Sequence, residues 1–547
     1  MDAHTRFQTP IVGVLPAITH YFEQLGLAAT IDGLVPWEGD VPLGTLVEVL
    51  IANRLLQPKA LFRVGHWAQA AAVTDSYGLT ADAEPLNDDR LGRALERLAA
   101  HAPDIQAALV LKAIERFDLD VTQVHYDLTT VELYGASEAE TTEGQPPPAP
   151  RPAYGRTTSG RTHVKPVQCG LDVTGDGGVP VGHLPRDGNA GEVDSHLENL
   201  KLLARTLPRG KLLYIADTKL DAPDNLLAIA ARKGQFLCGG ALSPQLQDRY
   251  LKLRDQLHRV SYFPQSQAKL PPEKRDEYQA VEVSEHLGGT VDGKKVGLDY
   301  RLIFVWSESK ARQEAWTRER HTAKVVAEFE AVQRNLGRYS LKTTEAIVRR
   351  LEAAKGKYAE GALFDDRLSR DEAGHFQLDW DLGAAARERW QALEGVYVLK
   401  TNLPRKDYRL TKVLRTYKGQ SRVERRFHHL KGPLAVAPMF LKNPERIAGL
   451  LCVLVWALMV LALMERQVRR ELKGAPLFGL YPEGRPSPAP TGPALLQGMS
   501  GRCVVIVHQG GEAQRRLCQP DPVQRRIMQL LGINSEQLQT FKRRCGM

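Results

Sequence analysis

The stretches VHYDLTT (124–130) and LLYIADTKL (212–220) decide the fold of this 547-residue chain. The first is β-branched and alternating, which is typical of a strand, and the second begins with the short apolar run of a buried strand. Asp127 lies inside the first stretch, and Asp217 ends the apolar run of the second. A carboxylate at the end of an apolar strand lies at a sheet edge, where it meets other polar groups without being buried unpaired. Both aspartates are therefore candidate site residues, although each alone also suits a cap or a loop.

The segments around these strands indicate an α/β domain. A hairpin is predicted where residues 163–173 and 179–188 flank the glycine-rich sequence TGDGG. A helical pattern over 194–206 follows the hairpin, and a helix and a further short strand at 235–240 follow Asp217. The order is strand, hairpin, helix, strand, helix, strand.

The N-terminal region, residues 1–118, is predicted to be helical. Residues 43–56 have apolar positions at helical spacing, and Asp88 and Asp104 are placed to cap two further, separate helices. Short helices with interspersed arginines suit a DNA-binding module, but they equally suit any helical bundle.

The interval 241–393 mixes charged helices, such as 309–337, with strands, such as 299–306. A strand is predicted at 395–402. The region after residue 471 is rich in loops, with one predicted strand at 503–508 and a basic end.

The segment YKGQSRVERRFHHLK (417–431) is the third motif that carries chemistry. Tyr417, Gln420, Glu424 and Lys431 stand at i, i+3, i+7 and i+14, which are near whole turns of a helix. If the segment is one helix, these side chains share a face. The alternative is a solvated, charged amphipathic helix without a specific role.

This segment resembles the Tyr-Arg-Glu-Lys signature of bacterial insertion-sequence DDE transposases. Tyr417, Glu424 and Lys431 match the signature with its spacing of seven and seven, whereas Gln420 stands at the arginine position and Arg422 is close by. The strands that carry the two aspartates are similar to those of the family. The resemblance extends over roughly residues 40–465.

The resemblance implies an α/β fold: an RNase H-like mixed-sheet catalytic core, interrupted by a mostly β insertion and preceded by a helical domain. The expected divisions are a helical domain that binds DNA ends, the first part of the core, the insertion, the second part of the core and a C-terminal region for interaction or DNA contact (1–118, 119–240, 241–393, 394–470 and 471–547).

The resemblance also implies that Asp127, Asp217 and Glu424 are the catalytic, metal-binding carboxylates. Two Mg²⁺ ions about 4 Å apart, with Mn²⁺ able to substitute, activate the attacking oxygen and stabilise the leaving one in an in-line displacement. Magnesium prefers such hard oxygen ligands. The expected activity is that of a nuclease and strand transferase.

The expected partners are the terminal inverted repeats of the element and target DNA, bound by a homodimer or larger assembly. Expected DNA contacts are made by Tyr417, Gln420, Arg422 and Lys431, which belong to the signature segment. Trp306, at the end of a strand in the insertion, could stack on an unpaired base. The competing interpretation is that Trp306 is a core tryptophan.

Composition agrees with a soluble, DNA-binding protein. The formal net charge is +9, which favours a polyanionic partner only modestly. The six cysteines have no C-x-x-C spacing, and no signal-peptide pattern begins the sequence, so we expect a cytoplasmic protein.

The uncharged segment 447–464 has the length of a short membrane span, but we expect it to be a buried core helix and expect no membrane association. A membrane-associated protein is therefore one rival hypothesis. A DNA-binding relative that has lost catalysis and a stand-alone RNase H-like nuclease are the others.

Overall fold

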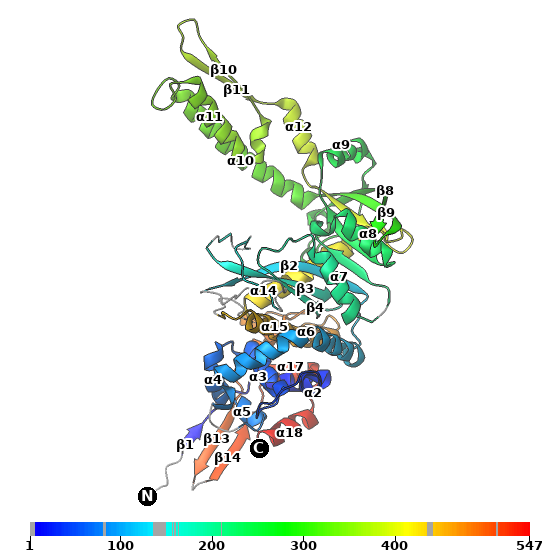
Figure 1. Ribbon diagram of the computed structural model, residues 1–547, viewed down its shortest axis with the longest axis vertical. Coiled ribbons are helices and arrows are strands. Elements are labelled where there is room, and N and C mark those ends of the chain that lie inside the picture. Colours follow the sequence, from blue (N-terminus) through cyan, green and yellow to red (C-terminus); the bar gives the residue numbers. More distant parts are fainter. Residues whose placement is uncertain are drawn as a thin grey trace. The chain divides into compact units, whose positions relative to one another are not determined.

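The computed structural model describes residues 6–79, 84–134, 149–155, 157, 160–161, 163–208, 210–434, 441–509 and 512–547 (Figure 1). The chain forms two compact units. Unit 1 comprises Met1–Gln235 and Lys418–Met547, and unit 2 comprises Phe236–Tyr417.

The sheet of unit 1 follows the predicted order of elements. Its strands lie in the order β4-β3-β2-β5, where β2 and β3 are antiparallel, β3 and β4 are antiparallel, and β2 and β5 are parallel. The parallel pair requires a crossover, which α7 provides after β4. The strands are β2 (Gln123–Leu133), β3 (Lys165–Thr174), β4 (Pro180–Arg186) and β5 (Leu213–Ala216), and α7 spans Ser195–Thr206.

The apolar segment forms the middle of α15 (Pro444–Leu472). Every residue from Ile447 to Met464 is buried, and α15 packs against α3 (Leu43–Leu56), α6 (Asp88–Phe117) and β4. The prediction of a buried helix is confirmed. Within the part of the chain that the structure describes, α15 is the one helix whose length and hydropathy would allow it to cross a membrane.

Helix α6 differs from the prediction of two separately capped helices. It is one helix of 30 residues that contains Pro103 and begins after Asn87, whose side chain accepts a hydrogen bond from the Arg90 amide. A proline inside a helix removes one backbone hydrogen bond. The continuous buried face on both sides of Pro103, which includes Leu98 and Leu109, offsets that loss.

The remaining elements of unit 1 come from both ends of the chain. Strand β13 pairs with β1 near the N-terminus and with β14, so the region after residue 471 holds a second strand that the sequence did not predict. These elements are β1 (Arg6–Gln8), α1 (Leu15–Leu25), α2 (Leu27–Leu34), α4 (Val64–Ala70), α5 (Val73–Ser76), α16 (Gly492–Gly498), β13 (Val504–Gln509), β14 (Glu512–Leu517), α17 (Pro522–Leu530) and α18 (Ser535–Arg544).

Unit 2 contains antiparallel strands in the order β6-β12-β9-β8-β7. These are β6 (Gln235–Gly240, whose first residue belongs to unit 1), β12 (Val396–Thr401), β9 (Lys294–Ser307), β8 (Tyr278–Val291) and β7 (His258–Arg259). Its other elements are α9 (Pro244–Leu253), α10 (Glu308–Arg334), α11 (Thr344–Gly356), β10 (Phe364–Arg370), β11 (Phe376–Leu382), α12 (Ala384–Leu393) and α13 (Leu410–Tyr417).

The expectation of a mostly β insertion is wrong, because long helices share it with the strands. Val325, Phe329 and Val332 stand at i, i+4 and i+7 on α10 and pack with α11 and the β10–β11 hairpin in a separate core. That apolar spacing is helical rather than alternating.

Candidate active site

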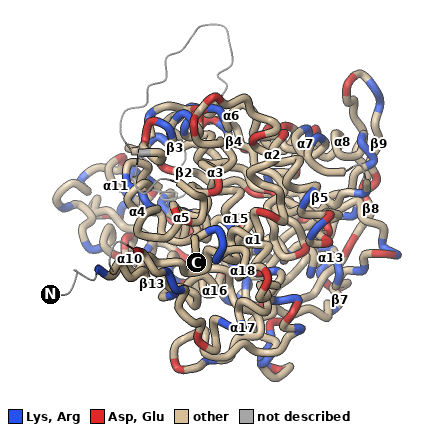
Figure 2. Tube along the Cα trace, turned by 90° about the horizontal axis from the view of Figure 1, so that it is seen from below, with Lys and Arg blue, Asp and Glu red and all other residues tan. Residues whose placement is uncertain are grey.

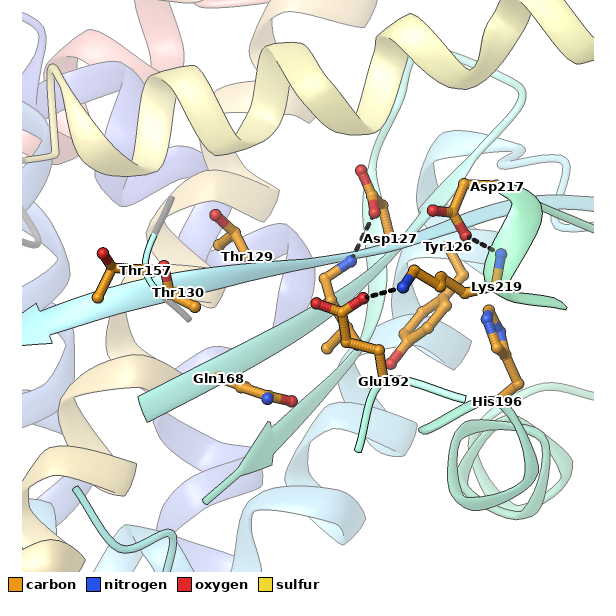
Figure 3. Close-up of a pocket in the computed structure, with 11 residues that line it drawn as sticks. Tyr126, Asp127, Thr129, Thr130, Thr157, Gln168, Glu192, His196, Asp217 and Lys219 are labelled. Carbon is orange, nitrogen blue, oxygen red and sulfur yellow. Dashed lines mark hydrogen bonds and ion pairs between the residues drawn. The ribbon is translucent and has the colours of Figure 1, made fainter. Parts of the chain in front are cut away.

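Asp127 and Asp217 lie at equivalent positions of two neighbouring parallel strands. The pairing of β2 with β5 sets His125 beside Ile215, and two residues further along both strands the same register reaches the two aspartates. Asp217 follows β5 directly and caps a 3₁₀ turn, Thr218–Leu220, because its Oδ1 accepts the Lys219 amide at 2.9 Å. The two carboxylates therefore lie close together where β5 ends beside the middle of β2 (Figure 3).

The aspartates line a cavity of about 350 Å³. A third acidic side chain, Glu192, enters it from the loop between β4 and α7, and its Oε2 lies 2.9 Å from the Lys219 ammonium. No motif marks Glu192 in the sequence, since a single glutamate in a loop is usually a solvated surface residue. The other lining residues are Tyr126, Leu128, Thr129, Thr130, Thr157, Gln168 and His196.

The charges in this cavity repel one another. Burial raises the pKa of Asp127 to about 7, and the carboxylates of Asp217, Glu424 and Glu192 add to that rise. The Leu128 amide, which donates to Asp127 Oδ1 at 2.8 Å, opposes it. Burial and Glu192 likewise raise the pKa of Asp217. Like charges held together away from bulk water favour either protonation or a bound cation.

Gln420 ties the helix that carries Glu424 to strand β2. Its Nε2 donates to the carbonyl of Tyr126 at 2.8 Å, and its Oε1 lies 3.2 Å from His125 Nδ1. Glu424 follows in the first turn of α14 (Ser421–Lys431). The start of the helix that carries Glu424 is therefore hydrogen-bonded to the backbone immediately before Asp127. This contact explains why the charge of Glu424 adds to the raised pKa of Asp127.

Arg426 locks the same helix from its buried side. Its guanidinium is 2% exposed and donates to the carbonyls of Gly177 and Gly178, each at 2.7 Å, in the turn between β3 and β4. It also pairs at 3.2 Å with Glu465 of α15, which accepts the Gly492 amide at 2.8 Å. The charged end of the apolar helix therefore fixes α14.

Residues 417–431 do not form one helix, so the condition under which the four signature positions share a face is not met. Helix α13 ends at Tyr417, a 3₁₀ turn spans Lys418–Gln420, and α14 begins at Ser421. At this break the side-chain amide of Gln420 points into the protein, where its nitrogen and its oxygen each contact strand β2.

The structure places the predicted DNA contacts in different surroundings. Arg422 and Lys431 are half-buried on α14, and burial lowers the pKa of both, with Glu132 opposing that change at Lys431. Tyr417 and Trp306 belong to unit 2. Trp306 is half-buried against the core formed by residues such as Tyr250 and Phe304, which favours the packing interpretation.

The donor set fits magnesium by its chemistry. The carboxylates around the cavity offer oxygen only, which is what Mg²⁺ prefers. Glu424 itself is exposed on α14 and does not line the cavity. Among the described residues, no three His, Cys, Asp or Glu side chains are already spaced to hold a metal ion.

Comparisons with known proteins add two findings. Residues 7–109 match the model of a family described as a domain of unknown function, DUF4277. The chain is also similar to a piggyBac transposase in a cryo-EM structure of its synaptic complex with hairpin DNA, with 6% identity, 90% of this chain and 81% of that chain covered, and a TM-score of 0.37. No curated protein matches. The function proposed below therefore depends on the site.

Proposed function

We propose that this protein is the DNA transposase of a bacterial insertion sequence. It binds the terminal inverted repeats of its element, cleaves phosphodiester bonds there and transfers the ends to target DNA. One observation carries the proposal: Asp127, within β2, lies beside Asp217, which directly follows the paired parallel strand β5, and Gln420 ties the helix of Glu424 to the residue before Asp127. The signature-like sequence 417–431, which includes that helix, supports the same function.

Asp127, Asp217 and Glu424 would hold two Mg²⁺ or Mn²⁺ ions. Such ions, when bound, supply activation of water or of a DNA 3′-hydroxyl and stabilisation of the leaving oxygen. The protein would contribute three things. Paired strands orient the two aspartates, the Gln420 hydrogen bond positions the helix of Glu424, and partial burial of the two aspartates keeps competing water from their carboxylates.

Binding to DNA depends on lysine and arginine contacts with phosphates. In Figure 2, Lys and Arg are interspersed with Asp and Glu along most elements, so the excess of +9 does not by itself mark a DNA surface. We propose that Lys431 contacts a phosphate near the cleaved end, and that a homodimer or larger assembly pairs two ends in the bacterial cytoplasm.

The test uses duplexes that carry the inverted repeats flanking the gene, with Glu424→Gln beside wild type and exposed Glu471→Gln as the matched control. We expect Glu424→Gln to bind repeat ends in a gel shift but not to nick them in Mg²⁺, whereas the control does both. Transfer of pre-cleaved ends into a plasmid separates a transposase from a stand-alone nuclease. Nicking by Glu424→Gln at the wild-type rate would overturn the proposed site, and absence of nicking by wild type would favour an inactive DNA-binding relative.

A further inference from the structure

We propose that Glu192 is a fourth carboxylate ligand of the metal site, and that the Lys219 ammonium occupies the place of a cation there until metal binds. This inference rests on the proposed function. It adds a ligand that the sequence resemblance does not supply.

Lys219 joins two of the carboxylates that face the cavity. Its backbone N–H donates to Asp217 Oδ1, and its Nζ pairs with Glu192 Oε2, both at 2.9 Å. Figure 3 shows this pair beside Asp127. A single lysine therefore compensates negative charge at the point where the acidic side chains gather.

Glu192 is better placed than Glu424 to act on both aspartates. Glu192 lines the same cavity as Asp127 and Asp217, whereas Glu424 does not. A ligand that serves two metal ions needs this proximity to both aspartates.

The loop that carries Glu192 is held on both sides by buried side chains. Gln168 donates to the carbonyl of Ala190 at 2.7 Å, Arg186 donates to that of Gly191 at 2.6 Å, and Asn225 donates to that of Val193 at 3.2 Å. These donors come from β3, β4 and α8 (Pro223–Ala231). The glutamate is therefore presented to the cavity from a fixed backbone.

The Lys219–Glu192 pair is weak enough to be displaced. Its side chains are 45% and 37% exposed, and exposed ion pairs contribute little to stability. A divalent cation therefore gains the attraction of Glu192 at little loss.

The experiment measures Mn²⁺ affinity by calorimetry on the full chain bound to a repeat-ended duplex, for wild type, Glu192→Gln, Lys219→Met and Asp127→Asn, with Glu471→Gln as control. We expect Glu192→Gln to weaken binding at least tenfold and Lys219→Met to leave it equal or tighter. Circular dichroism confirms that each variant is folded.

The outcomes separate the two proposals. If Asp127→Asn loses Mn²⁺ while Glu192→Gln binds it like wild type, this inference is overturned and the proposed function stands. If Lys219→Met weakens binding as much as Glu192→Gln, Lys219 does not compete with metal and the inference is again overturned. If wild type binds no Mn²⁺ with DNA present, both proposals fall together.

Discussion

The raised pKa of Asp127 makes the stability of the metal-free protein depend on pH. The native carboxyl has a pKa of about 7 against an ordinary value of 3.8, so its protonated form is favoured in the folded protein. This favourable contribution is fully present below the unfolded pKa, declines as pH rises and is lost above about 7. Each unit of pKa shift corresponds to about 1.4 kcal/mol, so the difference between the folded and the ordinary pKa of Asp127 changes the free energy of unfolding by at most about 4 kcal/mol.

Asp127→Asn removes the charge and keeps an oxygen that can accept the Leu128 amide. The variant should therefore melt at the same temperature as wild type near pH 4 and several °C higher at pH 8 without metal. Adding Mg²⁺ at pH 8 should raise the melting temperature of wild type but not of the variant. The assay is thermal unfolding across pH, with Asp104→Asn, exposed on α6, as the control. A difference in melting temperature between wild type and Asp127→Asn that does not grow with pH would show that the Asp127 carboxyl is not held protonated in the folded protein.

Three further predictions concern the parts that place the site and bind DNA. Arg426→Met leaves Glu465 buried with less compensation, so it should destabilise the protein by about 3 kcal/mol in thermal or denaturant unfolding, whereas exposed Arg425→Met should change stability little. Gln420→Ala should slow nicking at least tenfold without weakening end binding in a gel shift, and equal nicking rates would show that the tether does not position Glu424. Trp316, 58% exposed on α10 with the Arg320 guanidinium 4.5 Å from its ring centre, should contribute to DNA binding. Joint replacement of Trp316 and Arg320 by alanine should lower DNA affinity and its salt dependence, and Val348→Ala, in the same unit, should not.

The strands that carry the aspartates were predictable because their patterns are local. Asp127 and Asp217 each stand in a short run of strand-forming residues, and the buried α15 is apolar on every side. These signals do not depend on distant parts of the chain.

The parts that the sequence did not predict depend on tertiary contacts. The break before α14 exists because Gln420 bonds to Tyr126 and His125, almost 300 residues earlier. Glu192 becomes a site residue only because side chains of β3, β4 and α8 hold its loop. Neither contact leaves a periodic pattern in the sequence.

The most direct test of the central claim is anomalous scattering from Mn²⁺ in crystals of the protein bound to a cleaved repeat end. We expect two manganese peaks about 4 Å apart, in contact with the carboxylates of Asp127, Asp217 and Glu424. Well-ordered carboxylates without manganese between them, or manganese bound only elsewhere on the chain, would contradict this expectation.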